Sequence, residues 1–424
     1  MLVSAHGQHA PKLAMGPGIP AESLSSYAVT QALWRFLAND KVTLAALVEP
    51  LREYARRNIR QEDEYALVAT DWSKLDYKNH TAKTDTTQLT HENDIGYELT
   101  TQLLINCKTG QPIAPIQMHL KNAEGYLSTA KIPVPDGHRL NQILPLMEEA
   151  REMKFPIKLV NVIDREADAV SYFRQWSKNK HLFLVRAKNS GLVNWQGKQL
   201  KCQQIVETLN AEGGFKQVRE VTAKGEKCTQ FVAEAAVVLD RPATRKVNGS
   251  SIKIEGEPLQ LRLVVSKILD KNTGKNLSEW YLLTNVEDSV PTSTIALWYY
   301  YRWTIESYFK LMKSGGQELE HWQQESAMAI FKRLLIASMA VTTIWEISAS
   351  ETPEAIELKQ IFTRLSGKAR KRGRPPTKGV LLSGLLIFLQ MYDFLESIGY
   401  DLTKIKHYKQ IAIKAMPAFA QRLV

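Results

Sequence analysis

Four polar side chains share one predicted helical face in the stretch that ends at Lys313. They are Tyr299, Arg302, Glu306 and Lys313. The stretch contains no glycine or proline and stops just before two glycines, so we expect a helix. At about 100° per residue, the four side chains fall within an arc of about 60°. One carboxylate beside three groups that can contact phosphate indicates metal-assisted chemistry on a polyanion. The simpler interpretation is a helix with a solvated charged face.

Two aspartates supply candidate partners for Glu306. Asp71 follows the apolar run Tyr65–Thr70, and Asp164 follows Ile157–Ile163. Both runs are predicted strands, and in the predicted element order they are neighbours in one sheet. Three carboxylates suit two Mg²⁺ or Mn²⁺ ions, which can drive in-line displacement at a phosphodiester. Either aspartate alone could instead be a strand-end or helix-capping carboxylate. Three further aspartates compete with the first ligand but lie in a polar stretch: Asp76, Asp85 and Asp94.

The elements that must position these carboxylates alternate between strands and helices. Tyr97–Asn106 and Pro112–Leu120 are predicted to form a hairpin. Leu140–Lys154 and Ala167–Trp176 have helical patterns, and His181–Arg186 reads as a strand. The resulting order, β-β-β-α-β-α-β, predicts an α/β fold with a mixed sheet.

Outside this core, residues 190–285 contain short β-like runs between turns rich in glycine and lysine, which predicts a β-rich insertion. Helical patterns precede and follow the core. We therefore expect five regions: an N-terminal helical region that binds DNA ends (1–64), the first part of the catalytic core (65–189), the insertion (190–285), the second part of the core (286–347), and a helical C-terminal region with a basic linker that supports dimerisation (348–424).

Composition narrows the class of partner. The 424 residues carry a formal net charge of +11, which favours nucleic acid and, less often, an anionic membrane. Three cysteines lie far apart and are expected to be reduced thiols of a cytoplasmic protein. The first 20 residues lack the apolar segment of a signal peptide. The longest apolar runs, within Leu334–Trp345 and Val380–Leu389, are short for a membrane span and predict buried helices.

The polar helix has a spacing that resembles the Y-R-E-K signature of bacterial insertion-sequence transposases of the family numbered four. Asp164–Asp168 reads D-R-E-A-D, which resembles the second-aspartate motif of that family. Asp71 resembles the first aspartate of its D-D-E triad. The similarity extends from about Gln31 to beyond Trp322.

This resemblance implies a ribonuclease-H-like core interrupted by a β-rich insertion, and cut-and-paste transposition. Nicking, hairpin formation, hairpin opening and strand transfer would be the same displacement with different nucleophiles. It implies two Mg²⁺ (or Mn²⁺) ions held by Asp71, Asp164 and Glu306. It also implies phosphate contacts from Tyr299, Arg302 and Lys313. The partners would be double-stranded DNA, as terminal inverted repeats and target, and a second copy of the chain. The location would be the bacterial cytoplasm, with the nucleoid.

Five further positions receive a role. Trp280 resembles the tryptophan that holds a flipped base in this family, with a buried strand tryptophan as the alternative. Arg186 and Lys188 resemble phosphate contacts, with an ordinary charged strand end as the alternative. Arg372 and Arg374 lie in an R-G-R-P segment that resembles a minor-groove motif. The alternative for that segment is a flexible basic linker.

The N-terminal helical pattern is a departure from the family, because it covers only Ser26–Arg60. Sequence-specific binding of transposon ends is therefore less firmly predicted than catalysis. Two other functions remain open. One is a structure-directed nuclease with the same metal site, and the other is a DNA-binding protein derived from a transposase that no longer catalyses.

Overall fold

The computed structural model describes residues 24–400, apart from 61, 136, 224–225, 248–249, 315–316, 369–374 and 398. Its centre is a 13-stranded sheet in the order β5-β4-β3-β1-β6-β7-β15-β14-β11-β8-β9, with β2 beside β3 and β10 beside β11. The strands of its first half are β1 (Tyr65–Asp76), β2 (Thr87–Gln88), β3 (Ile95–Asn106), β4 (Pro112–Asn122), β5 (Gly125–Ser128), β6 (Lys158–Ile163) and β7 (Leu182–Arg186).

Strand direction defines a ribonuclease-H-like core. β1, β3 and β4 are antiparallel neighbours, as short connections allow, whereas β6 pairs in parallel with both β1 and β7. The parallel strands are linked through helices, as crossover connections require. The predicted mixed sheet is therefore confirmed, including the pairing of the strand that contains Asp71 with the strand that precedes Asp164.

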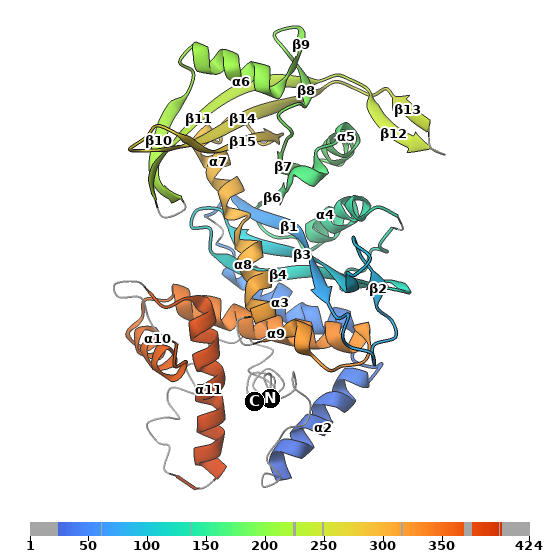
Figure 1. Ribbon diagram of the computed structural model, residues 1–424, viewed down its shortest axis with the longest axis vertical. Coiled ribbons are helices and arrows are strands. Elements are labelled where there is room, and N and C mark those ends of the chain that lie inside the picture. Colours follow the sequence, from blue (N-terminus) through green and yellow to red (C-terminus); the bar gives the residue numbers. More distant parts are fainter. Residues whose placement is uncertain are drawn as a thin grey trace.

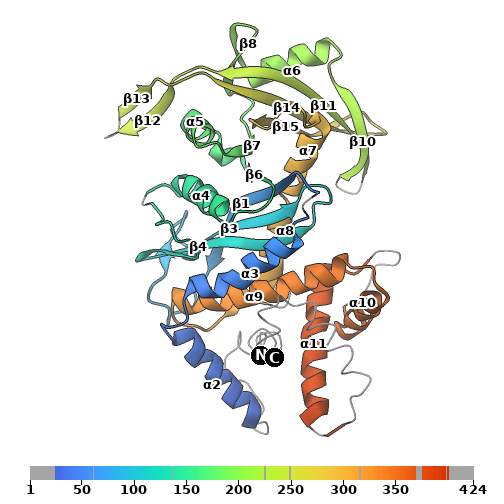
Figure 2. The same cartoon turned by 180° about the vertical axis from the view of Figure 1, so that it is seen from behind.

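Helices cover both faces of this core (Figures 1 and 2). On one side lie α4 (Ile143–Glu152), which follows the 3₁₀ turn η1 (Arg139–Gln142), and α5 (Val170–Lys178), which follows η2 (Arg165–Ala167). On the other side lie α3 (Leu44–Asn58) and α9 (Ala327–Ala349). Each face has its own apolar core, because β-strand side chains alternate between the two faces.

Further helices extend from the side of the sheet that α9 covers (Figure 1). They are α2 (Leu24–Ala38), α10 (Pro353–Leu365) and α11 (Lys378–Ser397), with the short 3₁₀ turn η3 (Leu319–His321) leading towards α9. α9 is long and apolar enough to cross a membrane by these two measures. However, 89% of its apolar window is buried inside the fold, where it contacts α3, β4 and α2. Packing therefore accounts for its composition, as predicted for a buried helix.

The β-rich insertion extends the sheet of the core instead of forming a separate layer. Its last strand, β15, pairs antiparallel with β7, with Leu283 opposite Val185. One helix, α6, was not predicted; Ile205 and Val206 on its inner face are buried. The elements of the insertion are β8 (Leu192–Trp195), β9 (Lys198–Lys201), α6 (Cys202–Ala211), β10 (Lys216–Ala223), β11 (Glu226–Leu239), β12 (Ala243–Val247), β13 (Ser250–Ile254), β14 (Leu259–Asp270) and β15 (Asn276–Thr284).

The polar helix is broken, so the prediction of one continuous stripe was wrong. α7 (Thr292–Tyr301) and α8 (Thr304–Ser314) are separated by a turn at Arg302 and Trp303. The backbone N–H groups of both turn residues donate to carbonyls three residues back, which tightens the chain. Tyr301 packs so closely on the β3–β4 turn that a Cβ on Gly110 would lie 2.3 Å from its ring. The C-terminal end of α7 therefore packs against the sheet at the β3–β4 turn, and α8 then continues across β1.

Candidate active site

Asp71 and Asp164 occupy equivalent positions on neighbouring parallel strands. The last paired residues of β1 and β6 are Ala69 and Val162, and each aspartate lies two residues further on. Because the period of a strand is two residues, equal offsets direct both side chains to the same face. Asp71 was predicted to follow its strand, but β1 continues to Asp76. What ends near Asp71 is the parallel pairing, while the antiparallel pairing with β3 continues.

Both aspartates are oriented by backbone N–H groups. The N–H of Trp72 donates to Oδ1 of Asp71 at 2.8 Å, and the N–H of Glu166 donates to Oδ1 of Asp164 at 2.8 Å. In the second case, Asp164 is the N-cap of the 3₁₀ turn η2. The capping role considered for an isolated aspartate is therefore present, and it fixes the carboxylate beside the end of β6.

Arg302 joins Asp71 to Glu306. Its Nη1 donates to Asp71 Oδ2 at 2.8 Å, and its Nη2 donates to Glu306 Oε1 at 2.9 Å. The Arg302 side chain is only 9% exposed, and that of Asp71 is 18% exposed, whereas Glu306 is 42% exposed. The turn between α7 and α8 thus places a guanidinium between two of the three predicted metal ligands.

Burial raises the pKa of Asp71 above its ordinary value. The guanidinium of Arg302 and the N–H of Trp72 oppose this shift, while the carboxylates of Asp164 and Glu306 add to it. The two other carboxylates therefore lie close enough to Asp71 to affect its charge. A cluster of like charges around a buried carboxylate is a common feature of metal and catalytic sites.

The donor set matches a hard divalent cation in ligand type, because carboxylate oxygens are the ligands that Mg²⁺ and Mn²⁺ prefer. In the part of the chain that the structure describes, no three His, Cys, Asp or Glu side chains converge in a metal-holding arrangement. Arg302 donates to one oxygen of Asp71 and to one oxygen of Glu306, so a guanidinium lies between these two carboxylates.

Tyr299 is buried and does not share an exposed face with Glu306. Its ring is 2% exposed and meets Trp280 edge-on, with 5.3 Å between ring centroids. Burial raises the pKa of the Tyr299 phenol, with Arg302 and Arg186 among the charges nearby. Trp280 is itself only 8% exposed. The predicted alternative of a buried strand tryptophan therefore describes its packing.

Two exposed aromatic residues beside the site were missed by the sequence analysis. Tyr300 is 55% exposed and Trp303 is 49% exposed, and both line a cavity of about 590 Å³ that also includes Trp280. Arg219 of β10 adds a positive charge to its wall. The signal in the sequence was the aromatic-rich run Y-Y-Y-R-W, but its pattern does not show which members are exposed.

The other predicted basic residues have different surroundings. Lys313 donates to the backbone carbonyl of Lys74 and pairs with Glu320 at 3.0 Å, so it lies against the far part of β1. Arg186 ends β7 and is half-buried near Tyr299. Lys188 is exposed. Its backbone N–H donates at 2.7 Å to Oδ2 of Asp168, the last residue of the D-R-E-A-D run. The predicted residues Arg372 and Arg374 lie outside the described residues.

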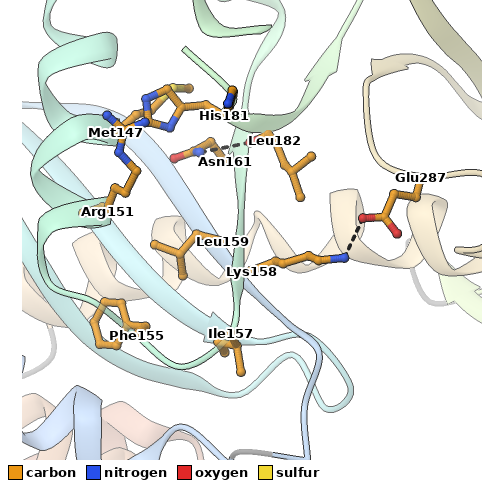
Figure 3. Close-up of a pocket in the computed structure, with 12 residues that line it drawn as sticks. Met147, Arg151, Phe155, Ile157, Lys158, Leu159, Asn161, His181, Leu182 and Glu287 are labelled. Atoms are coloured by element: carbon orange, nitrogen blue, oxygen red, sulfur yellow. Dashed lines mark hydrogen bonds and ion pairs between the residues drawn. The ribbon is translucent and has the colours of Figure 1, made fainter.

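A separate cavity of about 370 Å³ lies at the opposite end of β6 (Figure 3). It is lined by the beginning of that strand and by α4, with Lys158 paired to Glu287 at its edge. Asp164 follows the other end of the strand. This cavity therefore contains no member of the carboxylate group.

No protein-family model and no curated protein matches the chain. Among solved structures, the chain is similar to the Drosophila P element transposase strand transfer complex. The identity is 11%, the match covers 93% of this chain and 80% of that chain, and the TM-score is 0.22. A likeness at this level supports no functional argument, so the fold assignment rests on strand order and direction.

Proposed function

We propose that this protein is a DNA transposase that catalyses cut-and-paste transposition of an insertion sequence. The observation that supports this most strongly is the equivalent placement of Asp71 and Asp164 on paired parallel strands, with Glu306 linked to Asp71 through Arg302. The ribonuclease-H-like sheet places Asp71 and Asp164 on neighbouring strands, and α8 carries Glu306 on the other side of Arg302. The match of this set to the Y-R-E-K and D-R-E-A-D motifs favours the insertion-sequence family numbered four.

In this proposal, Asp71, Asp164 and Glu306 bind two Mg²⁺ or Mn²⁺ ions. When bound, such ions activate the attacking oxygen and stabilise the leaving oxygen of an in-line phosphodiester displacement. By holding the ions, the carboxylates would set the position of the scissile phosphorus relative to the ends of β1 and β6. Arg302 exchanges its carboxylate partners for non-bridging phosphate oxygens, for which its planar fork is suited.

Four displacements then follow at one site. Water attacks phosphorus at the transposon end, the P–O3′ bond breaks and a 3′-hydroxyl is released. That 3′-oxygen attacks a phosphodiester of the opposite strand, displaces the 3′-oxygen of the flanking DNA and closes a hairpin. Water then attacks the hairpin phosphodiester and displaces the same transposon 3′-oxygen. Finally the 3′-oxygen attacks a phosphodiester of target DNA and displaces another 3′-oxygen. Each step forms one P–O bond and breaks one, so the same protein groups serve all four.

The exposed aromatic residues support the hairpin step. A hairpin bends the backbone sharply, which is easier when a base leaves the stack and rests on an aromatic face. The cavity lined by Trp280, Tyr300 and Trp303 is adjacent to Arg302 in the chain. We assign Trp280 to the wall of that base-binding cavity. Lys313, Arg186 and Lys188 are assigned to phosphate contacts around the bent strand.

The same proposal includes the partners and the location of the protein. Two transposon ends must be brought together, so a homodimer is the expected synaptic form, with the C-terminal helices as the contact region. The substrates would be terminal inverted repeats and target DNA in the bacterial cytoplasm. The net charge of +11 supports binding to a polyanion.

The test is a reaction with DNA carrying the inverted repeats that flank the gene. With Mg²⁺ and a precleaved 3′-hydroxyl end, joined products are expected from the native chain and none from Asp71→Asn or Glu306→Gln. Cleavage without joining would favour the structure-directed nuclease. DNA binding that is unchanged in both variants, with neither cleavage nor joining by the native chain, would favour the non-catalytic DNA-binding protein.

A further inference from the structure

Arg139, at the start of η1, contacts both aspartate-bearing segments. Its Nε donates to Oε1 of Glu166 at 2.9 Å, and its Nη2 donates to the other oxygen of the same carboxylate. Its Nη1 donates to Glu98 of β3 at 2.8 Å. The guanidinium also lies over the indole of Trp72, with 5.0 Å to the ring centroid. One side chain thus binds three elements that meet beside the site.

The residues that Arg139 holds are also the residues that orient the aspartates. Trp72 donates its backbone N–H to Asp71, and Glu166 donates its backbone N–H to Asp164, both at 2.8 Å. Arg139 therefore touches neither carboxylate but contacts the side chain of each N–H donor. The guanidinium therefore joins the two segments that carry the aspartates.

We propose that Arg139 is a positioning residue that sets the distance and orientation between Asp71 and Asp164 for metal binding. The inference rests on the proposed function, because it assumes that both aspartates are metal ligands. Bidentate binding of Glu166 is specific to a guanidinium fork. Lysine at this position would keep the charge and the ability to make a cation–π contact but would lose the bidentate contact.

A role confined to stability is the competing explanation, and the two differ in what they change. The side chains of Arg139 and Glu166 are 31% and 32% exposed, so this ion pair alone stabilises the fold only modestly. Residues that orient metal ligands, by contrast, typically change metal affinity by about 10- to 100-fold when they are replaced. The measurement must therefore be metal affinity in protein that is shown to be folded.

The experiment is a titration of the full chain with Mn²⁺, followed by electron paramagnetic resonance, in the presence of an inverted-repeat DNA end. Arg139→Gln is expected to weaken Mn²⁺ binding by about 10-fold or more, and Arg139→Lys to weaken it to a similar extent. The metal concentration for half-maximal cleavage should rise in parallel, while the rate at saturating Mn²⁺ recovers. Arg151→Gln is the matched control, because Arg151 forms an ion pair on α4 with Glu148 and contacts neither aspartate segment. The Mn²⁺ affinity of Arg151→Gln should equal that of the native chain.

Unchanged Mn²⁺ affinity in folded Arg139→Gln would overturn the inference, as would a reduced rate that saturating metal does not restore. If Arg139→Gln fails to fold, Glu166→Gln applies the same test from the other side of the pair, with the same expected loss. Failure of the proposed function gives a different result: the native chain and Asp71→Asn would then bind Mn²⁺ equally.

Discussion

Replacement of Arg302 by alanine should destabilise the protein in a manner that depends on pH. The variant leaves Asp71, 18% exposed, without its ion-pair partner. Removing one member of a buried pair costs about 3 to 5 kcal/mol, and the partial exposure of Asp71 places the expected loss near about 3 kcal/mol. The bond to Glu306 adds only about 0.5 kcal/mol, because that carboxylate is 42% exposed and screened by water.

The pH dependence follows from the raised pKa of Asp71. Burial makes the folded protein bind this proton more tightly than the unfolded chain does, so stability from this group is present at low pH. It is lost as pH rises from the ordinary carboxyl range through the raised pKa. Arg302 opposes that loss by lowering the pKa. The destabilisation by Arg302→Ala should therefore be largest at neutral pH and should shrink as Asp71 becomes protonated.

The assay is urea unfolding of the native chain and Arg302→Ala at pH 7.5 and at pH 4.5, followed by tryptophan fluorescence. Arg302→Lys is the control, since it keeps a positive charge and should lose about half as much stability as the alanine variant. A destabilisation by Arg302→Ala that is the same at both pH values would refute the argument. It would mean that the Asp71 charge does not depend on the guanidinium.

Three further predictions test other parts of the structure. Gly110→Ala should destabilise the chain by about 2 kcal/mol or more, measured by thermal unfolding, because the new Cβ would strike Tyr301 and the residue has a φ of +70°; unchanged stability would contradict the close contact. His119 is buried, and burial lowers its pKa to about 4, so stability should fall by about 3 kcal/mol as pH drops from about 6.5 to about 4. This His119-dependent loss should disappear in His119→Gln, and its persistence there would assign it to other groups. Trp303→Ala should slow hairpin formation by about 10-fold or more while leaving the first nick within about 2-fold, since one base stacked on an aromatic ring is worth about 1 to 3 kcal/mol; equal slowing of both steps on a gel time course would exclude base stacking.

Local pattern was sufficient for the elements of the ribonuclease-H-like core. Apolar runs of strand length identified β1 and β6, and their order in the chain was enough to pair them. The constraint is physical, because parallel strands need a crossover and sequential elements pack as neighbours. The placement of Asp71 beside Asp164 follows from that pairing and from the two-residue period of strands.

Tertiary contacts decided the surroundings of the individual side chains at the site. Helical periodicity predicted one stripe from Tyr299 to Lys313, but the helix breaks at Arg302, where Tyr301 packs on the β3–β4 turn and Arg302 donates to Asp71. Tyr299 is buried against an insertion strand, a contact that no local pattern contains. Arg139 is a second example. It lies before α4, and nothing in the sequence around it indicates its contacts with Glu166, Glu98 and Trp72. Its link between the two aspartates exists only because β1, β3 and η2 converge there, and such convergence is set by the packing of the whole sheet.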